Sequence, residues 1–356
     1  MLVVHARDRT QVLRTVGVVF GATALLWTFR DTDPQRVALL LRRVGGAGAL
    51  IVIPQFLSLF VESVGWKLAF ERMGQVLPLS GLLRVRLATE ALAQTLPVGT
   101  VFCESMKPLL LGRNCGADLS TSLSGMAARK WLLVSSQSVY VAVFGLLGFA
   151  TLTRISPQVL GTTGLPQLVL AAALLLVLLA VGGYSVLAQG RVASCVLTSL
   201  QRLPSAWLRA RLAPLESRFE RADGQLRTFF ARGGGAPWPW LAFLTGWLLE
   251  AADTVLILAL LGVHLPWTTV GALEVSASFV RNVAFVVPAG LGVQDVSYLA
   301  FLRALDVPDA LNVAAAFLLL KRCKECFWAL CGYAVLAMDL RPLRPVPTLL
   351  SEAWRG

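Results

Sequence analysis

The stretch Leu165–Gln189, LPQLVLAAALLLVLLAVGGYSVLAQ, decides the fold class because it runs without a single charged residue. A helix rises about 1.5 Å per residue, so a helix of this length crosses the roughly 30 Å hydrocarbon core of a bilayer. Trp131–Leu152 is a second stretch without any charge. Two such stretches predict an all-α, polytopic membrane protein.

The composition of the whole chain agrees with this class. Of its 356 residues, 56% are hydrophobic and only 15% are charged, and the mean hydropathy is +0.70. Soluble domains carry about 25% charged residues. The formal net charge of +12 indicates a positive-inside bias first and affinity for anionic lipid headgroups second. Nucleic acid is not an expected partner, because the basic residues do not lie on a soluble fold.

Charge and hydropathy organise the chain as one membrane domain, 1–356. We expect about six full spans plus two broken or re-entrant helical hairpins. The expected full spans lie near 12–30, 44–70, 122–151, 166–189, 237–262 and 307–338. The expected regions are a first half (1–189), a basic cytoplasmic connector (190–232), a second half (233–340) and a cytoplasmic tail (341–356). The positive-inside rule places both termini, and the basic region Glu62–Arg86, on the cytoplasmic side of a bacterial inner membrane.

The connector 190–232 carries eight arginines against Glu216, Glu220 and Asp223. After Pro214 its apolar residues recur at spacings that make one face of a helix. Two interpretations follow from this pattern. The helix lies on the inner leaflet of the membrane, or it packs on the protein's own cytoplasmic surface.

Two apolar segments, about 81–112 and 271–305, are interrupted at corresponding places. In each, a proline is followed two residues later by a glycine. Proline breaks a helix and glycine allows a turn at small steric cost. The residues that make the two breaks are Pro97, Gly99, Pro288, Gly290 and Gly292. Interrupted backbone at membrane depth is tolerated only inside protein or beside a wet cavity, so we expect a cavity here.

The correspondence continues beyond the breaks. Glu104 and Asp295 each lie seven residues after the proline of their segment, and a basic pair follows some 32 to 34 residues after each proline. The pairs are Arg129–Lys130 and Lys321–Arg322. These offsets predict an internal duplication. Because the charge pattern places the breaks on opposite sides of the membrane, we expect inverted repeats, a plan that recurs in transporters.

Several ionisable residues fall within apolar runs, and each would cost about 2.5–3.5 kcal/mol if it faced lipid. We therefore expect them to face one another or a wet cavity with an excess of positive charge. They are Glu90, Glu104, Lys107, Arg129, Lys130, Glu250, Asp253, Glu274, Arg281, Asp295, Lys321, Arg322, Lys324 and Glu325.

Arginine offers paired hydrogen bonds to a phosphate and lysine a point charge, so a phosphate-bearing headgroup fits such a cavity. The expected lipid ligands are Lys107, Arg129, Lys130, Arg281, Lys321 and Arg322. Glu104 and Asp295 would hold these cations or bind a coupling proton. The alternative is a set of buried ion pairs that fix the helix register.

Catalytic signals are weak in this chain. Its two histidines, His5 and His264, lie near an end and in a loop, and the glycines of AGLG (289–292) lack the strand–helix unit of a dinucleotide site. Cys323 and Cys326 form a C-x-x-C in a helical context, which predicts buried thiols and not a redox pair. We expect no enzyme activity, no cofactor and no metal.

Two pairs of motifs resemble a known family. FVVPAGLGVQDVSYLAFL (285–302) with LLLKRCKECFWALCGY (318–333), and LPVGTVFCESMKPLLLGRNCG (96–116) with AARKWLL (127–133), resemble the lysylphosphatidylglycerol synthase transmembrane-domain family of flippase-like proteins. The resemblance covers about 10–340, and the wording PAGLGVQ is nearest to the branch associated with hopanoid biosynthesis. Cys103 and Lys107 stand where the family usually has glycine and arginine, and Ala289 and Asp295 where glycine and glutamate are common.

The resemblance implies a flippase-like role with phospholipids or hopanoid-related lipids. We expect a protein that moves an amphipathic lipid through a basic cavity, either passively or coupled to an ion. Alternatives are a membrane-embedded headgroup transferase, or a non-catalytic scaffold that holds lipid-modifying enzymes through 190–232. The expected partners are membrane lipids, such enzymes and a second copy of the chain. Lysyl-lipid synthesis is not expected, because the chain ends soon after its last span without an aminoacyl-transferase domain.

Overall fold

The charge-free stretch that decides the fold class forms α8, Leu165–Ala188, in the computed structural model of the chain. The structure describes residues 23, 30–96, 99–202, 212–231, 237–283 and 293–339, with the side chains of 99–101, 200, 280–283 and 293 excepted. Every regular element in these residues is a helix. This confirms the prediction of an all-α polytopic membrane protein.

The helices follow the predicted segments closely. In chain order they are α2 (Pro34–Val44), η1 (Gly45–Ile51), α3 (Val52–Arg72), α4 (Leu79–Thr95), α5 (Gly99–Cys115), α6 (Leu119–Leu147), α7 (Phe149–Leu160), α8 (Leu165–Ala188), α9 (Val192–Gln201), η2 (Ala213–Leu215), α11 (Glu216–Ala231), α12 (Pro237–Leu260), α13 (Trp267–Val283), α14 (Val293–Ala304) and α15 (Ala310–Asp339).

Four segments of the described chain are long and apolar enough to cross a membrane: Pro34–Arg72, Leu119–Leu147, Leu165–Ala188 and Pro237–Leu260. The helix α15, of 30 residues, lies where the last span is predicted, but it is not among these four segments. The predicted first span, 12–30, lies almost wholly outside the described residues. Both α2 and α7 fall largely between the predicted spans, in segments that the prediction leaves as connections.

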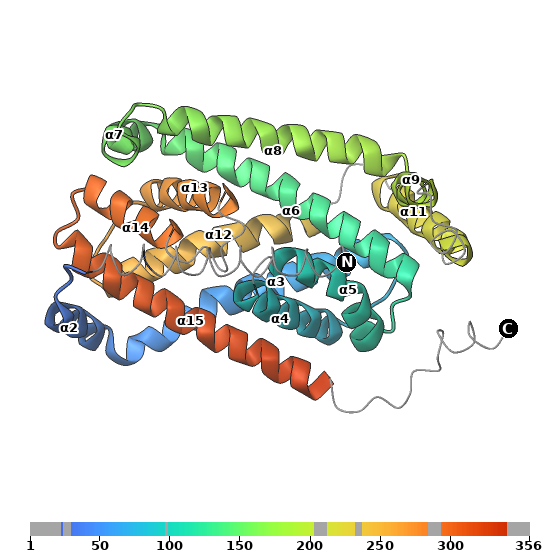
Figure 1. Cartoon of the computed structure of the whole chain (residues 1–356), viewed down its shortest axis with the longest axis horizontal. Helices are drawn as coiled ribbons and strands as arrows, with labels where there is room; N and C mark the ends of the chain where they lie inside the picture. Colours follow the sequence, from blue (N-terminus) through green and yellow to red (C-terminus); the bar gives the residue numbers. More distant parts are fainter. Residues whose placement is uncertain are drawn as a thin grey trace, which may run out of the picture.

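The long helices pack along the long axis of the molecule (Figure 1), with α6 beside α8, α3 beside α12 and α4 beside α15. The α4–α5 pair lies toward the end that holds α9 and α11, whereas α13 and α14 lie toward the end that holds α2 and α7. Each broken segment also packs on the long helix that follows the broken segment of the other half, α4 on α15 and α13 on α6. The expected inverted duplication is compatible with this arrangement and stays a prediction.

The connector packs on the protein itself. In α11 the apolar residues Ala222, Leu226 and Phe229 are buried, and the helix contacts α6, α8 and α9. Asp223, also buried, accepts hydrogen bonds from the backbone N–H groups of residues 193 and 194 at 2.9 Å each, which caps the start of α9. Of the two interpretations of this segment, the structure favours the helix packed on the protein's own surface.

Parts of the region Glu62–Arg86 lie inside the bundle, with Glu62 in the middle of α3 and Arg86 buried in α4. Its cytoplasmic placement stays a prediction. The prediction for the two thiols of the C-x-x-C is wrong. Cys323 and Cys326 are exposed and not buried. The thiols face outward because the side of α15 that enters the protein is taken by neighbouring residues such as Lys324.

Candidate intramembrane cavity

A carboxylate shared by two arginines lies in the middle of the bundle. Oε2 of Glu62 on α3 accepts from Nη2 of Arg86 on α4 at 2.9 Å and from Nη2 of Arg129 on α6 at 3.0 Å. The Arg129 guanidinium also lies 5.5 Å from the centroid of the Trp66 ring. Both arginines are buried. Three helices of the first half are thus joined through one acid.

A second buried ion pair joins the corresponding helices of the second half. Lys324 on α15 donates to Asp253 on α12, and both side chains are buried. Glu62 and Arg129 lie on α3 and α6, the helices before and after the first broken segment. Asp253 and Lys324 lie on α12 and α15, the helices before and after the second broken segment. Glu62 and Asp253 hold equivalent positions under the predicted duplication, but Lys324 lies beyond Lys321–Arg322, the predicted counterpart of Arg129–Lys130.

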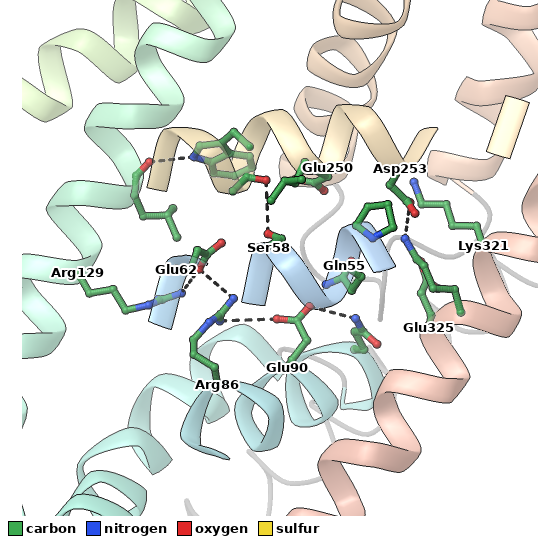
Figure 2. A pocket seen from close by; sticks show the side chains of 17 residues that line it. Gln55, Ser58, Glu62, Arg86, Glu90, Arg129, Glu250, Asp253, Lys321 and Glu325 are labelled. Carbon is green, nitrogen blue, oxygen red and sulfur yellow. Dashed lines mark hydrogen bonds and ion pairs between the residues drawn. The ribbon is translucent and has the colours of Figure 1, made fainter. Parts of the chain in front are cut away.

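A cavity of about 350 Å³ lies between the two ion pairs. Figure 2 shows its labelled side chains converging from α3, α4, α6, α12 and α15. Its acidic lining residues are Glu62, Glu90, Glu250, Asp253 and Glu325. Its basic lining residues are Arg86, Arg129, Lys321 and Lys324. The expected excess of positive charge is absent from this described lining, which holds five acids and four bases.

Of the predicted lipid ligands, the structure brings Arg129 and Lys321 to this cavity. Lys130 is exposed and points away from it. Adjacent residues on a helix are separated by about 100°, at 3.6 residues per turn, so Arg129 and its neighbour do not face the same cavity. The side chain of Arg281 lies outside the described residues.

The other predicted charges form local pairs elsewhere. Lys107 is buried and donates to Glu104 at 2.6 Å within α5, and neither lines the cavity. Arg322 donates from Nη2 to Oδ1 of Asp295 at 2.7 Å and from Nη1 to Oε2 of Glu325 at 2.5 Å. Of these contacts only Arg322–Asp295 joins two helices, α15 and α14, and fits the alternative interpretation of ion pairs that fix helix register.

The breaks themselves are only partly described. Pro97, Pro288, Gly290 and Gly292 lie outside the described residues, and Gly99 is the first residue of α5. The helices on either side nevertheless end where the sequence predicts. The first break falls between α4 and α5 and the second between α13 and α14.

Glu62 and Arg86 are the site residues that sequence reasoning missed. Glu62 stands alone in the apolar run SLFVESVGW (58–66), which is the same signal that marked the other buried acids. The denser charge that follows in α3, at Lys67, Glu71 and Arg72, led to its assignment to a cytoplasmic region. A charge in the interior of an apolar helix is functional or paired by default, and this rule would have found it.

An apolar groove of about 460 Å³ lies on another side of α15, against α2. Val37, Ala38 and Leu41 of α2 face Leu318 and Leu319 of α15 across it. The Asp295–Arg322 pair also lines this groove. One helix therefore carries both a charged cavity and an apolar groove.

Some buried polar atoms of the cavity lining have no hydrogen-bond partner in the described part of the chain. They are Nε of Arg86, Nε of Arg129, Oε1 of Gln94 and Oδ1 of Asp253. Buried polar atoms are nearly always bonded in folded proteins. The lining thus offers both donors and acceptors to a polar group. No metal-type cluster of three or more His, Cys, Asp or Glu residues is gathered among the described residues.

Comparison with known families assigns the chain to one of them. A family model described as the lysylphosphatidylglycerol synthase TM region matches residues 14–319. The chain belongs to this family. The match confirms the family that the motifs resemble, and it covers the cavity-lining residues on α3, α4, α6 and α12 but ends before those on α15. No curated protein and no solved structure matched the chain.

Proposed function

We propose that this protein binds an amphipathic lipid within the membrane and carries its headgroup through the charged cavity. The observation that carries the proposal is the cavity of about 350 Å³ lined by charges of both signs inside an apolar bundle. An ionisable residue at membrane depth costs about 2.5–3.5 kcal/mol on insertion scales, and such residues usually mark a path for a polar substrate. Membership of the family supports a lipid-related membrane function.

The lipid belongs to the phospholipid or hopanoid-related class in this proposal, as the resemblance of PAGLGVQ (288–294) to the hopanoid-associated branch suggests. Pockets for small ligands are typically about 300–1,000 Å³, so the cavity has room for a headgroup. The apolar groove between α2 and α15 offers a surface for an acyl chain. The protein acts by binding and movement and not by catalysis, in a bacterial inner membrane with both termini in the cytoplasm.

A cavity-filling variant tests the proposal. Gln55 lines the cavity, so Gln55→Trp places an indole where the headgroup would pass. In liposomes that contain a fluorescent phospholipid, leaflet-selective quenching measures the rate of crossing. We expect Gln55→Trp to slow crossing about tenfold, which corresponds to ~1.4 kcal/mol in the barrier.

Gln35→Trp is the matched control, because Gln35 is exposed on α2. It should cross at the wild-type rate. Equal rates for Gln55→Trp and wild type would show that lipid does not use this cavity. Wild-type liposomes that cross no faster than protein-free ones would overturn the transport function itself.

A second candidate function is a scaffold for lipid-modifying enzymes. The observation that favours it is the orientation of α11, whose apolar face is buried while Arg221 and Arg227 remain exposed. Reversing the charge of Arg221 should abolish capture of acidic partner enzymes from solution. If partner binding is lost while lipid crossing is intact, the connector has the scaffold role.

A further inference from the structure

A chain of hydrogen bonds leads from the cavity into the protein at Lys321. Nζ of Lys321 donates to the hydroxyl of Tyr298 at 2.6 Å, and this hydroxyl donates to Oε1 of Glu274 at 2.8 Å. The hydroxyl of Thr254 donates to the same carboxylate oxygen. The ammonium also lies 4.4 Å from the centroid of the Tyr298 ring. Lys321 and Tyr298 are thus two donors in series that end on one carboxylate, which also accepts from Thr254.

The chain has one open end. Lys321 lines the cavity, whereas the exposed fractions of Glu274, Tyr298 and Thr254 are 2%, 1% and 1%. A proton that reaches Glu274 through these contacts must therefore come by way of Tyr298 and Lys321. At the buried end of the chain, Glu274 accepts from Thr254. The hydroxyl group of Thr254 does not ionise at ordinary pH, so the chain of proton donors ends there.

Glu274 differs from Glu62, Asp253 and Asp295, the acids of the ion pairs described above. Glu62, Asp253 and Asp295 each touch a cation directly. The hydrogen bonds to Glu274 come from two neutral hydroxyl groups. The Glu274 carboxylate is thus held by hydroxyl donors, and one of these donors is itself bonded to the cavity-lining Lys321.

We propose that Lys321, Tyr298 and Glu274 form a proton relay that connects the cavity to a buried proton-binding carboxylate. In the transfer, the ammonium of Lys321 gives a proton to the phenol oxygen as the phenol gives its own proton to Oε1 of Glu274. One N–H bond and the original phenol O–H bond break, a new phenol O–H bond and a carboxylic O–H bond form, and no electron is exchanged. The products are a neutral amine and a neutral carboxylic acid, and the amine can take a new proton from the cavity.

The relay changes the charge of the cavity lining. The described lining has five acids and four bases, and after the transfer it has five acids and three charged bases. A cationic group in the cavity favours the transfer and an anionic group opposes it. This proton site goes beyond the proposed lipid function, because it requires no particular lipid.

Other charges that act on the relay lie on the helices packed against α13, which are α6, α7, α8, α12 and α14. Asp253 on α12 interacts electrostatically with both Glu274 and Lys321. Between Leu165 and Ala188, α8 carries no charge. The remaining charged residues on these helices are Arg129, Lys130, Arg154, Glu250, Asp295 and Arg303.

Infrared difference spectroscopy tests the relay in the full-length protein. The protein is placed in vesicles of phosphatidylethanolamine and phosphatidylglycerol, and spectra are compared between acid and neutral pH. A protonated Glu274 gives a carbonyl-stretch band that a carboxylate lacks. We expect the isosteric Glu274→Gln variant to lose one such band.

Transfer into D₂O then measures access to the carboxyl group, because exchange of its proton shifts the band. Tyr298→Phe removes the middle of the relay and should slow this shift at least about tenfold, equal to ~1.4 kcal/mol in the barrier. Thr254→Val should change the band frequency through the lost hydrogen bond but leave the exchange rate as in the wild type. Tyr140→Phe, which removes another buried tyrosine hydroxyl, is the matched control and should change neither.

Three results would overturn the relay. The first is an unchanged set of carbonyl bands in Glu274→Gln. The second is exchange in Tyr298→Phe that is as fast as in the wild type. The third is exchange that Thr254→Val slows as much as Tyr298→Phe does. None of these results depends on lipid crossing, so the relay and the proposed function can fail separately.

Discussion

A single acid shared by two arginines is the strongest feature at the scale of the residue. Glu62 touches Arg86 and Arg129, and both guanidinium groups are buried. Attraction between buried charges mostly offsets the cost of taking them out of water, so removing one partner leaves that cost uncompensated. The cluster therefore fixes α3, α4 and α6 relative to one another.

Glu62→Gln should lower the free energy of unfolding by about 3–5 kcal/mol, because two buried cations lose their common acid. Unfolding by denaturant in mixed micelles, followed by circular dichroism, measures the change. Glu71→Gln is the control, since Glu71 pairs with Lys67 near the surface and exposed pairs contribute about 0–1 kcal/mol. Equal losses in the two variants would contradict the role of the cluster.

Close packing at Gly125 gives a second test at this scale. The ring of Phe70 occupies the space that a methyl group at Gly125 would need, so Gly125→Ala overpacks the contact between α3 and α6. We expect a loss of about 1–3 kcal/mol in unfolding free energy. Adding Phe70→Leu should recover part of this loss.

Gly182→Ala serves as the matched helical control. Nothing lies within 4 Å of the position of its added methyl group, and alanine is the better helix former by about 1 kcal/mol. This variant should be neutral or slightly more stable in the same unfolding measurement. A loss at Gly182 as large as the loss at Gly125 would show that packing on Phe70 is not the cause.

At the scale of the element, the start of α6 depends on a charged cap. The Asp118 carboxylate accepts from the backbone N–H of Thr121 at 2.9 Å and from the hydroxyl of Ser120 at 2.6 Å. Burial opposes the charged form, but these hydrogen bonds and the nearby Arg221 outweigh it and hold the pKa of Asp118 below its ordinary value of 3.8. The folded protein therefore favours the ionised carboxylate.

A depressed pKa sets the direction of a pH effect. The stabilisation from Asp118 is fully present above the pKa of the unfolded chain and is lost as pH falls through the lower pKa of the folded protein. Asp118→Asn keeps a capping oxygen but has no charge to titrate. The stability difference between wild type and this variant should be constant above pH 3.8 and shrink below it, as measured by thermal unfolding across a pH series. A difference that grows toward low pH would contradict the assignment.

Helix rotation decides which charges of an element reach the cavity. Lys321, Lys324 and Glu325 stand at i, i+3 and i+4, which are neighbours on one helical face, and all three line the cavity. Arg322 lies on another side and lines the apolar groove. The sequence offered Lys321–Arg322 as one basic pair, and the helix separates its members.

At the scale of the whole molecule, the turn after α12 and the helix α11 lie at opposite ends of the bundle. The turn after α12 lies at the end with α2 and α7, and α11 lies at the opposite end (Figure 1). Cysteines placed at His264 and at Glu220, in a background without Cys195, Cys323 and Cys326, should label from opposite sides of the membrane. A membrane-impermeant maleimide on sealed, oriented vesicles measures this. Labelling of both sites from the same side would contradict the arrangement.

Sequence alone determined that this protein is helical, spans a membrane and has two interrupted segments with matching spacing. Length, hydropathy and the proline–glycine breaks are local properties, so they can be read from a window such as Leu165–Gln189. The sequence also identified most of the buried charges, because an ionisable residue within an apolar run can be recognised without knowing the structure. Family membership followed from the same motifs.

Only the tertiary structure decided which of these charges meet. Glu62 and Arg129 are distant in sequence, as are Asp253 and Lys324, and helix packing brings each pair together. The balance of the cavity, which has five acids and four bases in its described lining, also depends on helix rotation, because adjacent residues such as Arg129 and Lys130 point about 100° apart. The sign of each charge follows from the residue type, but the direction in which the charged side chain points is set by the packing of its helix.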